Sequence, residues 1–161
     1  NLLDGGGGVD VLDGGAGNDT LRLDSGPAAQ QGATLTGGDG NDVFRFQPGY
    51  SGDHSQGADS VVITDFTQGA DILSFGLPAG IAAPSAIHTL TVQAGDTLAS
   101  LLTQAIHQTT TYTQPALSQF VLDGDTYLVM DTTADPTWAA SDLAIKLTGA
   151  HTLSMTDISF G

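Results

Sequence analysis

Large apolar side chains recur at one fixed offset from glycine-rich segments near the start of the chain. Leu12, Leu21 and Phe44 each end a stretch of the form G-G-x-G-x-D-x-U, where U is the apolar residue and x is variable. In such nonapeptides the glycines permit a tight turn, and the last three residues form a short strand whose U residue points into a core. Leu35 takes the U position in a Thr-Leu-Thr segment, although the turn before it is irregular. The pattern predicts a parallel β-roll, in which two repeats make one coil.

The apolar pattern changes after the repeats. Between residues 96 and 108, apolar residues recur at helical spacing, which predicts one helix with Asp96 as its N-cap. Residues 119–122 and 126–130 flank an Asp-Gly pair and predict a β-hairpin. Further strands are predicted at residues 61–63, 72–75 and 143–147.

These elements predict an all-β fold, a short parallel β-roll followed by a β-rich C-terminal cap with one helix. We divide the chain into the roll at residues 1–49, a segment that caps the roll at residues 50–77, and a β-rich C-terminal region at residues 78–161. The chain has 161 residues, enough for one domain or two small ones. Because the first residues read as the strand of a preceding repeat, we expect the chain to be the C-terminal piece of a longer protein.

The charge of the chain is strongly negative and comes from one residue type. All 18 acidic residues are aspartates, and with three basic residues they give a net charge of −15. This charge argues against nucleic acid and anionic membranes as partners, and no apolar run is long enough to insert into a membrane. The absence of cysteine excludes disulfides and thiolate metal sites. A bound cation would relieve the repulsion between the aspartates.

The aspartates of the repeats lie beside the glycines, which is the pattern of an oxygen-lined cation site. Each carboxylate supplies a hard oxygen close to the backbone, and the turn carbonyls supply more. Six or more oxygens around one ion is the coordination of Ca²⁺ rather than of zinc or copper. The candidate site residues of the three repeats are Gly5, Gly6, Gly8, Asp10, Gly14, Gly15, Gly17, Asp19, Gly37, Gly38, Gly40 and Asp42. The alternative, a flexible Gly/Asp-rich linker, does not explain the fixed offset of the apolar residues.

The order of the turns predicts which of them share an ion. Turns two apart stack on the same edge of a roll, so the second turn, with Asp19, stacks on the fourth, with Asp42. The irregular third turn, residues 24–32, stacks on the first, with Asp10. We therefore predict a good calcium site involving Asp19 and Asp42, and on the opposite edge a site that is either weaker or completed by repeats upstream of the chain.

The repeats resemble those of the repeats-in-toxin (RTX) family of exported bacterial proteins, over residues 1 to about 75. This resemblance implies calcium binding, export by a type I secretion machinery, and a location outside the cell or on its surface. The stretch A-D-x-x-x-I-T-D-F-x-x-G-x-D-x-L is similar to the module that follows the roll in RTX proteases and lipases. That similarity implies Asp59, Asp65 and Asp71 as further calcium ligands. The alternative is that each of these aspartates caps a turn through its own backbone.

A further candidate site follows the predicted hairpin. Asp131, Asp135 and Asp142 occupy positions 1, 5 and 12 of a loop that resembles an EF-hand. Pro136 stands where such loops have glycine, Asp142 replaces the usual glutamate, and no helix precedes the loop. The alternative is a turn-rich loop that buries Trp138.

No sequence feature indicates catalysis. The chain has no H-E-x-x-H, G-x-S-x-G or phosphate-loop motif, and its histidines are scattered singly. We therefore expect a non-enzymatic domain that folds when calcium binds after type I secretion. The last forty residues resemble the tails of type I-exported proteins, including surface-layer proteins. This favours a role in the export and assembly of a surface-layer or adhesin-type protein, with copies of itself as partners in a calcium-dependent lattice. The alternative is the export tail of a secreted hydrolase whose catalytic domain lies upstream.

Overall fold

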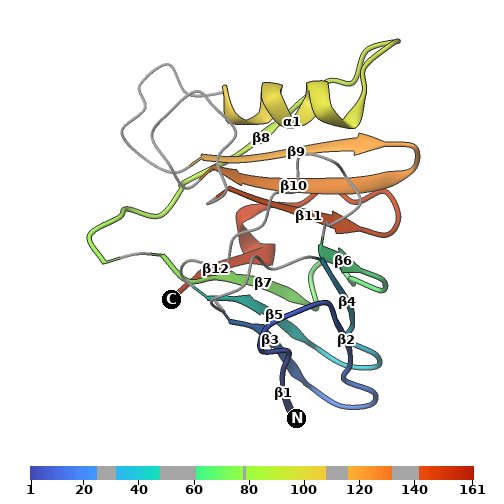
Figure 1. The fold of residues 1–161 in the computed structure, drawn as a ribbon, viewed down its shortest axis with the longest axis vertical. Helices are drawn as coiled ribbons and strands as arrows, with labels where there is room; N and C mark the ends of the chain where they lie inside the picture. The colour runs from blue at the N-terminus through green and yellow to red at the C-terminus, as the bar shows by residue number, and fades with distance from the viewer. Residues whose placement is uncertain (25–31, 48–60, 78, 108–115, 132–141) are drawn as a thin grey trace.

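Two β-sheets face one another across the main core of the molecule (Figure 1). The computed structural model describes residues 1–24, 32–47, 61–77, 79–107, 116–131 and 142–161. The first sheet has the strand order β1 (Leu2–Asp4), β3 (Thr20–Leu23), β5 (Val43–Phe46), β7 (Ile72–Phe75) and β12 (Ile158–Phe160). The second has the order β2 (Asp10–Asp13), β4 (Ala33–Thr36), β6 (Val61–Ile63), β11 (Leu143–Leu147), β10 (Asp125–Asp131), β9 (Ala116–Leu122) and β8 (Ile87–Thr89).

Strands β1 to β7 alternate between the two sheets, as a β-roll requires. Neighbouring strands are parallel and aligned, so that Leu21, Phe44 and Leu73 lie side by side in the first sheet. Leu35 and Ile63 pair in the second. These apolar residues are fully buried, because the two-residue period of a strand turns every second side chain towards the facing sheet. Strands β6 and β7 continue both sheets, so the parallel arrangement runs beyond the predicted boundary at residue 49.

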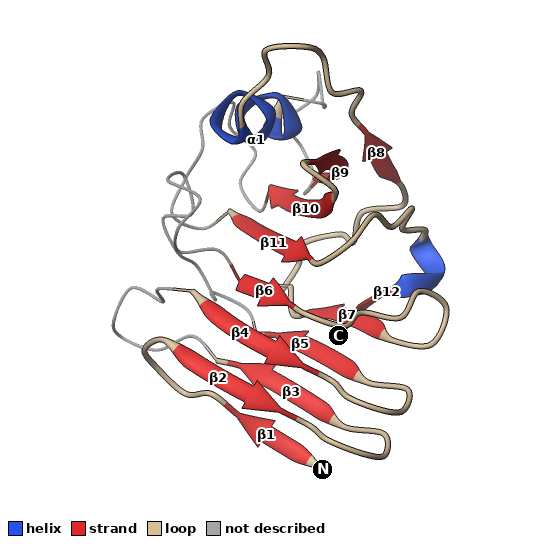
Figure 2. Cartoon of the chain, turned by 90° about the vertical axis from the view of Figure 1, so that its right-hand side faces the viewer, coloured by secondary structure: helices blue, strands red, loops and turns tan. Residues whose placement is uncertain are grey.

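The C-terminal part of the chain returns to complete both sheets. Strand β11 pairs in parallel with β6, and β12 pairs in parallel with β7. Figure 2 shows these two added strands beside the last coil of the roll. The ring of Phe75 stacks on Phe46, with centroids 5.4 Å apart, and lies 6.1 Å from the ring of Phe160. The three rings therefore connect β5, β7 and β12.

Beyond β11 the second sheet is antiparallel through β10 and β9, and β8 then pairs in parallel with β9. Strands β9 and β10 form the predicted hairpin, in which Leu122 pairs with Asp125 across the turn. The turn residues Asp123 and Gly124 have φ of 54° and 89°, which is the backbone that a two-residue hairpin turn favours. The hairpin prediction is confirmed.

Helix α1 (Leu98–Ile106) covers the antiparallel strands and forms a second apolar cluster with Phe120 and Val129. Its N-cap is Thr97, whose hydroxyl accepts a hydrogen bond from the N–H of Ser100. The prediction that Asp96 is the N-cap is therefore wrong. Asp96 closes the preceding turn instead, where it accepts a hydrogen bond of 2.8 Å from the N–H of Gln93.

The predicted fold class is confirmed, since the described residues are mostly β with one α-helix and a one-turn 3₁₀ helix, η2 (Met155–Asp157). No helix in the described part of the chain is long and apolar enough to cross a membrane.

Candidate metal centre

The second and fourth turns of the roll stack directly on one another. The N–H of Asp39 donates to the carbonyl of Gly15 at 2.9 Å, and the N–H of Gly17 donates to the carbonyl of Asp39 at 2.7 Å. The two turns approach so closely that a Cβ on Gly38 would overlap the carbonyl of Gly15, and one on Gly40 would overlap that of Gly17. Glycine is therefore required at these positions by the packing of the turns as well as by their positive φ.

Three buried aspartates form a column along this edge, which we call the aspartate ladder: Asp19, Asp42 and Asp71. Their exposed fractions are 2%, 1% and 3%. Each carboxylate accepts a hydrogen bond from the backbone of the residue before it in the column. The N–H of Asp19 donates to Asp42 Oδ1 at 2.8 Å, and the N–H of Asp42 donates to Asp71 Oδ1 at 2.9 Å. The amino group of Asn1 donates to Asp19 in the same way.

The repeat aspartates each retain one oxygen without a partner. The Oδ2 atoms of Asp10, Asp19 and Asp42 are buried and accept no hydrogen bond within the described residues. In each repeat this oxygen faces the first glycine of its own turn: a Cβ would lie 2.8 Å from it on Gly5 and 2.9 Å on Gly14. Burying a carboxylate oxygen without a partner is costly. The repetition of this arrangement in three turns indicates sites that suit a cation.

The electrostatics of the ladder also favour a cation. Burial raises the pKa of Asp42, and repulsion from Asp71, Asp19 and Asp65 raises it further. Across the described residues, no three histidine or carboxylate side chains converge as a metal cluster. A cation bound here would thus combine carboxylate oxygens with backbone carbonyls from the glycine turns. Such a hard, all-oxygen ligand set fits Ca²⁺.

Asp65 and Asp71 lie in the next turn of this edge, but their oxygens are already engaged. Asp65 Oδ1 accepts from the N–H of Gly37 at 2.9 Å, and Oδ2 accepts from the N–H of Gly38 at 2.8 Å. Asp71 Oδ2 accepts from the N–H of Thr67 at 2.8 Å, in addition to its bond from the ladder. Asp71 thus caps its own turn through Thr67, as in the alternative, whereas Asp65 caps the neighbouring turn.

The opposite edge of the roll is poorer in carboxylates. Asp10 pairs in register with Ala33, and Ala33 pairs with Val61. Neither of these neighbours has an oxygen to offer from its side chain. Of the three residues in this register position on the described strands of the opposite edge, Asp10 is the one aspartate. The corresponding positions of the ladder hold three aspartates.

The other predicted site residues are not brought into the ladder. Asp131 ends β10 and Asp142 precedes β11, and both are buried, with exposed fractions of 2% and 0%. They flank the paired residues Met130 and Leu143. Asp59 and Asp135 lie outside the described residues.

Sequence reasoning missed Asp157. This residue is 1% exposed, and its Oδ1 accepts a hydrogen bond of 2.9 Å from the N–H of Gly69 in the last turn of the roll. A signal was present, because Asp157 begins the sequence D-I-S-F, which is close to the D-I-L-S-F that begins at Asp71.

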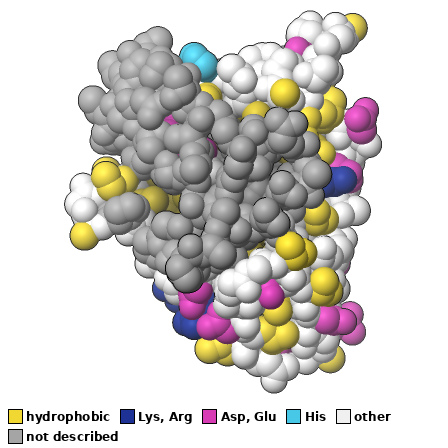
Figure 3. All heavy atoms as spheres, in the orientation of Figure 1, with side chains coloured by type: hydrophobic (Ala, Val, Ile, Leu, Met, Phe, Trp, Pro, Cys, Tyr) yellow, Lys and Arg dark blue, Asp and Glu magenta, His cyan; other side chains and the backbone are white. Residues whose placement is uncertain are grey.

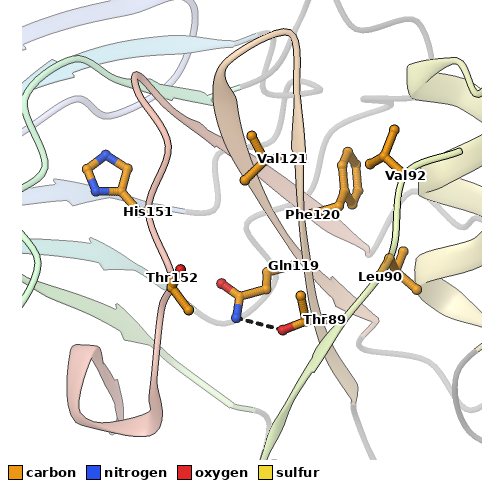
Figure 4. A pocket seen from close by; sticks show the side chains of 8 residues that line it. All are labelled: Thr89, Leu90, Val92, Gln119, Phe120, Val121, His151 and Thr152. Carbon is orange, nitrogen blue, oxygen red and sulfur yellow. Dashed lines mark hydrogen bonds between the residues drawn. The ribbon is translucent and has the colours of Figure 1, made fainter. Parts of the chain in front are cut away.

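A pocket of about 220 Å³ lies outside the roll, where β9 meets the segments before α1 and after β11 (Figure 4). Gln119 lies in it and donates to Thr89 Oγ1 at 3.1 Å and to the carbonyl of Leu153 at 3.0 Å, while its own oxygen accepts from Leu153 N–H. The amide therefore holds the C-terminal segment in place.

Over the face seen in Figure 3, acidic side chains outnumber basic ones.

Comparison with known proteins supports the assignment of the repeats. Residues 1–26 and 34–49 match the family model of the RTX calcium-binding nonapeptide repeat. No curated protein matches the chain. Among solved structures, the chain is similar to the AlgE6R3 subunit of the Azotobacter vinelandii mannuronan C5-epimerase, with a TM-score of 0.45 and 22% identity over 96% of this chain and 79% of that one. The glycine turns within these two ranges therefore match RTX calcium-binding nonapeptide repeats, a family that implies Ca²⁺ as the bound ion.

Proposed function

We propose that this chain is a calcium-dependent folding domain of an exported protein. Its glycine-rich repeats pass a type I secretion machinery unfolded and fold outside the cell when calcium binds, and the domain serves the assembly of a surface-layer or adhesin-type protein. The observation that carries the proposal is the repeated buried oxygen without a partner on Asp10, Asp19 and Asp42.

Without calcium, two costs oppose folding of the roll. Ordering a glycine-rich chain loses more conformational entropy than ordering other sequences. Folding also buries Asp19 and Asp42 beside one another, in a chain of net charge −15. When Ca²⁺ is bound, it supplies the positive charge that the buried oxygens lack. The free energy of metal binding then becomes free energy of folding.

Carboxylates, turn carbonyls and backbone hydrogen bonds have different roles in the proposed calcium binding. Asp19 and Asp42 hold the ion through their free Oδ2 atoms, and the glycine turns bring carbonyl oxygens close to it. The ladder hydrogen bonds fix the other oxygen of each carboxylate, so that Oδ2 keeps its direction. Calcium modules outside cells typically bind at roughly 10⁻⁴ to 10⁻³ M. Such affinity leaves the roll empty in the cytosol and filled outside.

Circular dichroism during a calcium titration tests this function, with magnesium as the control and particle size recorded in parallel. We expect β-structure to increase cooperatively at about millimolar calcium, and magnesium to be far less effective because it requires strict octahedral geometry. Growth in particle size with calcium would support assembly into a lattice, whereas a monomer at millimolar calcium would favour the export tail of a hydrolase. A roll fully formed in EDTA would contradict calcium-dependent folding.

A further inference from the structure

We propose that the roll closes on a coil that forms without calcium, in which backbone N–H groups take the place that the ion has in the earlier turns. This closing coil consists of β6, β7 and the turn between them (residues 64–71), together with β11, η2 and β12. The inference rests on the proposed function, since it contrasts this coil with turns that need the ion.

The carboxylates along the roll fall into two groups. Asp10, Asp19 and Asp42 each keep a buried oxygen without a partner among the described residues. In Asp65 and Asp71, by contrast, both oxygens accept hydrogen bonds from backbone N–H groups. The change from one group to the other occurs between the fourth turn and the closing coil.

Asp65 forms the clearest substitute for an ion. Its two oxygens accept from consecutive N–H groups, those of Gly37 and Gly38, at 2.9 and 2.8 Å. The side chain therefore ties the turn of the closing coil to the turn before it, as a shared calcium would. Hydrogen bonds to an ionised acceptor are about twice as strong as those between neutral groups, so this contact stabilises the coil.

Asp157 repeats this arrangement at the far side of the closing coil. Its Oδ1 accepts from Gly69 N–H at 2.9 Å, and its Oδ2 accepts from the N–H of Ser154 at 2.8 Å and from the hydroxyl of Ser154 at 3.0 Å. The closing coil thus contains a further carboxylate whose oxygens are both satisfied, and that carboxylate comes from the C-terminal segment.

Apolar contacts support the same coil independently of the ladder. Phe75 is fully buried and contacts Phe46 and Phe160. In the facing sheet, β11 pairs with the strands that α1 covers, and Ala144 lies in the separate cluster with Phe120. The closing coil is therefore attached to a hydrophobic core that contains no ladder aspartate.

The resemblance to RTX modules implied Asp65 and Asp71 as calcium ligands, and the geometry points to a different role. Their oxygens are saturated by N–H donors, so the two residues position turns. Calcium binding is then confined to the turns before the closing coil, and the calcium-dependent coils assemble on a surface that is already formed.

The substitutions Asp42→Asn and Asp65→Asn test these roles in the full chain, with Asp39→Asn as the control. Asp39 lies in the same turn as Asp42, and its side chain is exposed. The control therefore removes one negative charge without altering a ladder carboxylate. Bound calcium is counted by equilibrium dialysis, and stability in EDTA is measured by urea unfolding. We expect Asp42→Asn to lower calcium affinity at least about tenfold without lowering stability in EDTA. We expect Asp65→Asn to lower stability in EDTA and to leave the number of bound ions unchanged. A loss of bound calcium in Asp65→Asn, with stability in EDTA intact, would overturn the proposal.

Hydrogen exchange of the unaltered chain gives a second, independent test. In EDTA, we expect the amides of β6, β7, β11 and β12 to exchange at least about a hundredfold more slowly than those of an unfolded chain. The amides of β1, β2 and β3 should gain comparable protection only when calcium is added. Unprotected β7 and β12 in EDTA would refute the closing coil, whereas protected β1 to β3 in EDTA would refute the proposed function.

Discussion

At the scale of single residues, the close stacking of the turns distinguishes glycines that look equivalent in the sequence. Gly15 and Gly38 occupy the same place in successive turns of one edge, and both have positive φ, 84° and 93°. A Cβ on Gly15 would meet nothing within 4 Å, whereas one on Gly38 would overlap the backbone of Gly15. The two positions therefore share the same backbone strain but differ in packing.

We expect Gly38→Ala to destabilise the calcium-bound roll clearly more than Gly15→Ala. Both alanines carry the cost of positive φ, about 1 kcal/mol, and only the first also forces two turns apart. Urea unfolding at saturating calcium measures the difference between the two variants. Equal losses would show that the turns are not packed as closely as the structure indicates.

The pKa of Asp42 predicts how the calcium-free chain responds to acid. Because burial raises this pKa in the folded state, the folded chain holds a proton more tightly than the unfolded chain. Asp42 therefore destabilises the calcium-free fold at neutral pH, and this effect is relieved as the pH falls towards 3.8, the ordinary value for aspartate. Asp4 and Asp125, whose pKa is lowered by Arg22 and Lys146, act in the opposite direction. Asp4 is exposed and Asp125 is only partly buried, so their contribution is small.

In EDTA, we accordingly expect more β-structure at about pH 4.5 than at pH 7. Circular dichroism over this range measures the change, and Asp42→Asn should reduce it. A steady loss of β-structure on acidification would contradict the raised pKa as the dominant influence.

Residue spacing was sufficient to find Asp19 and Asp42, because each repeat places its aspartate two residues before the buried apolar residue. Spacing could not separate Asp42 from Asp71, which has the same offset. The difference arises from the length of the turn: six positions separate Thr36 from Asp42, and seven separate Thr64 from Asp71. The added residue lets the N–H of Thr67 reach Asp71 Oδ2. The corresponding oxygen of Asp42 has no hydrogen-bond partner among the described residues.

At the scale of elements, the joining of β12 to β7 depends on side chains from three strands. Phe75 is fully buried between Phe46 and Phe160. Local sequence predicted the hairpin and the helix, because turn residues and apolar periodicity act over a few positions. It did not predict that β11 and β12 would complete the two sheets of the roll, since those pairings join segments far apart in the chain.

We expect Phe75→Ala to lower the stability of the calcium-bound protein by about 3–5 kcal/mol, as for other buried aromatic side chains. The loss should reach β5 and β12 as well as β7, because the ring contacts both neighbours. Hydrogen exchange in these strands measures that spread. Val121→Ala is a suitable control, since Val121 is 40% exposed. A local effect confined to β7 would contradict the coupling.

At the scale of the whole molecule, two effects of calcium can be separated: it screens negative charge, and it coordinates oxygen atoms directly. The chain carries a net charge of −15, so any salt lowers its self-repulsion. The carboxylates of the ladder, however, lie on neighbouring strands about 4.8 Å apart. This spacing is shorter than the Debye length of about 10 Å at 0.1 M salt.

We therefore expect sodium chloride at about 0.5 M to leave the roll unfolded in EDTA, although it screens the surface charge. Calcium at about millimolar concentration should fold it at low or high salt. Circular dichroism across a matrix of the two salts is the measurement. Folding by sodium chloride alone would mean that general charge repulsion, rather than the unpartnered oxygens, holds the chain open.

The two ends of the chain are attached differently, so we expect them to resist a pulling force to different degrees. Asn1 leads into β1, which pairs with β3 alone among the described strands, at the end of the roll farthest from helix α1 (Figure 1). Gly161 follows β12, which is held by β7, by the carboxylate of Asp157 and by the ring of Phe160. Tension between the two ends would detach the coils one at a time from the N-terminal side. Each bound ion would set the force of one step, and the C-terminal side would yield last.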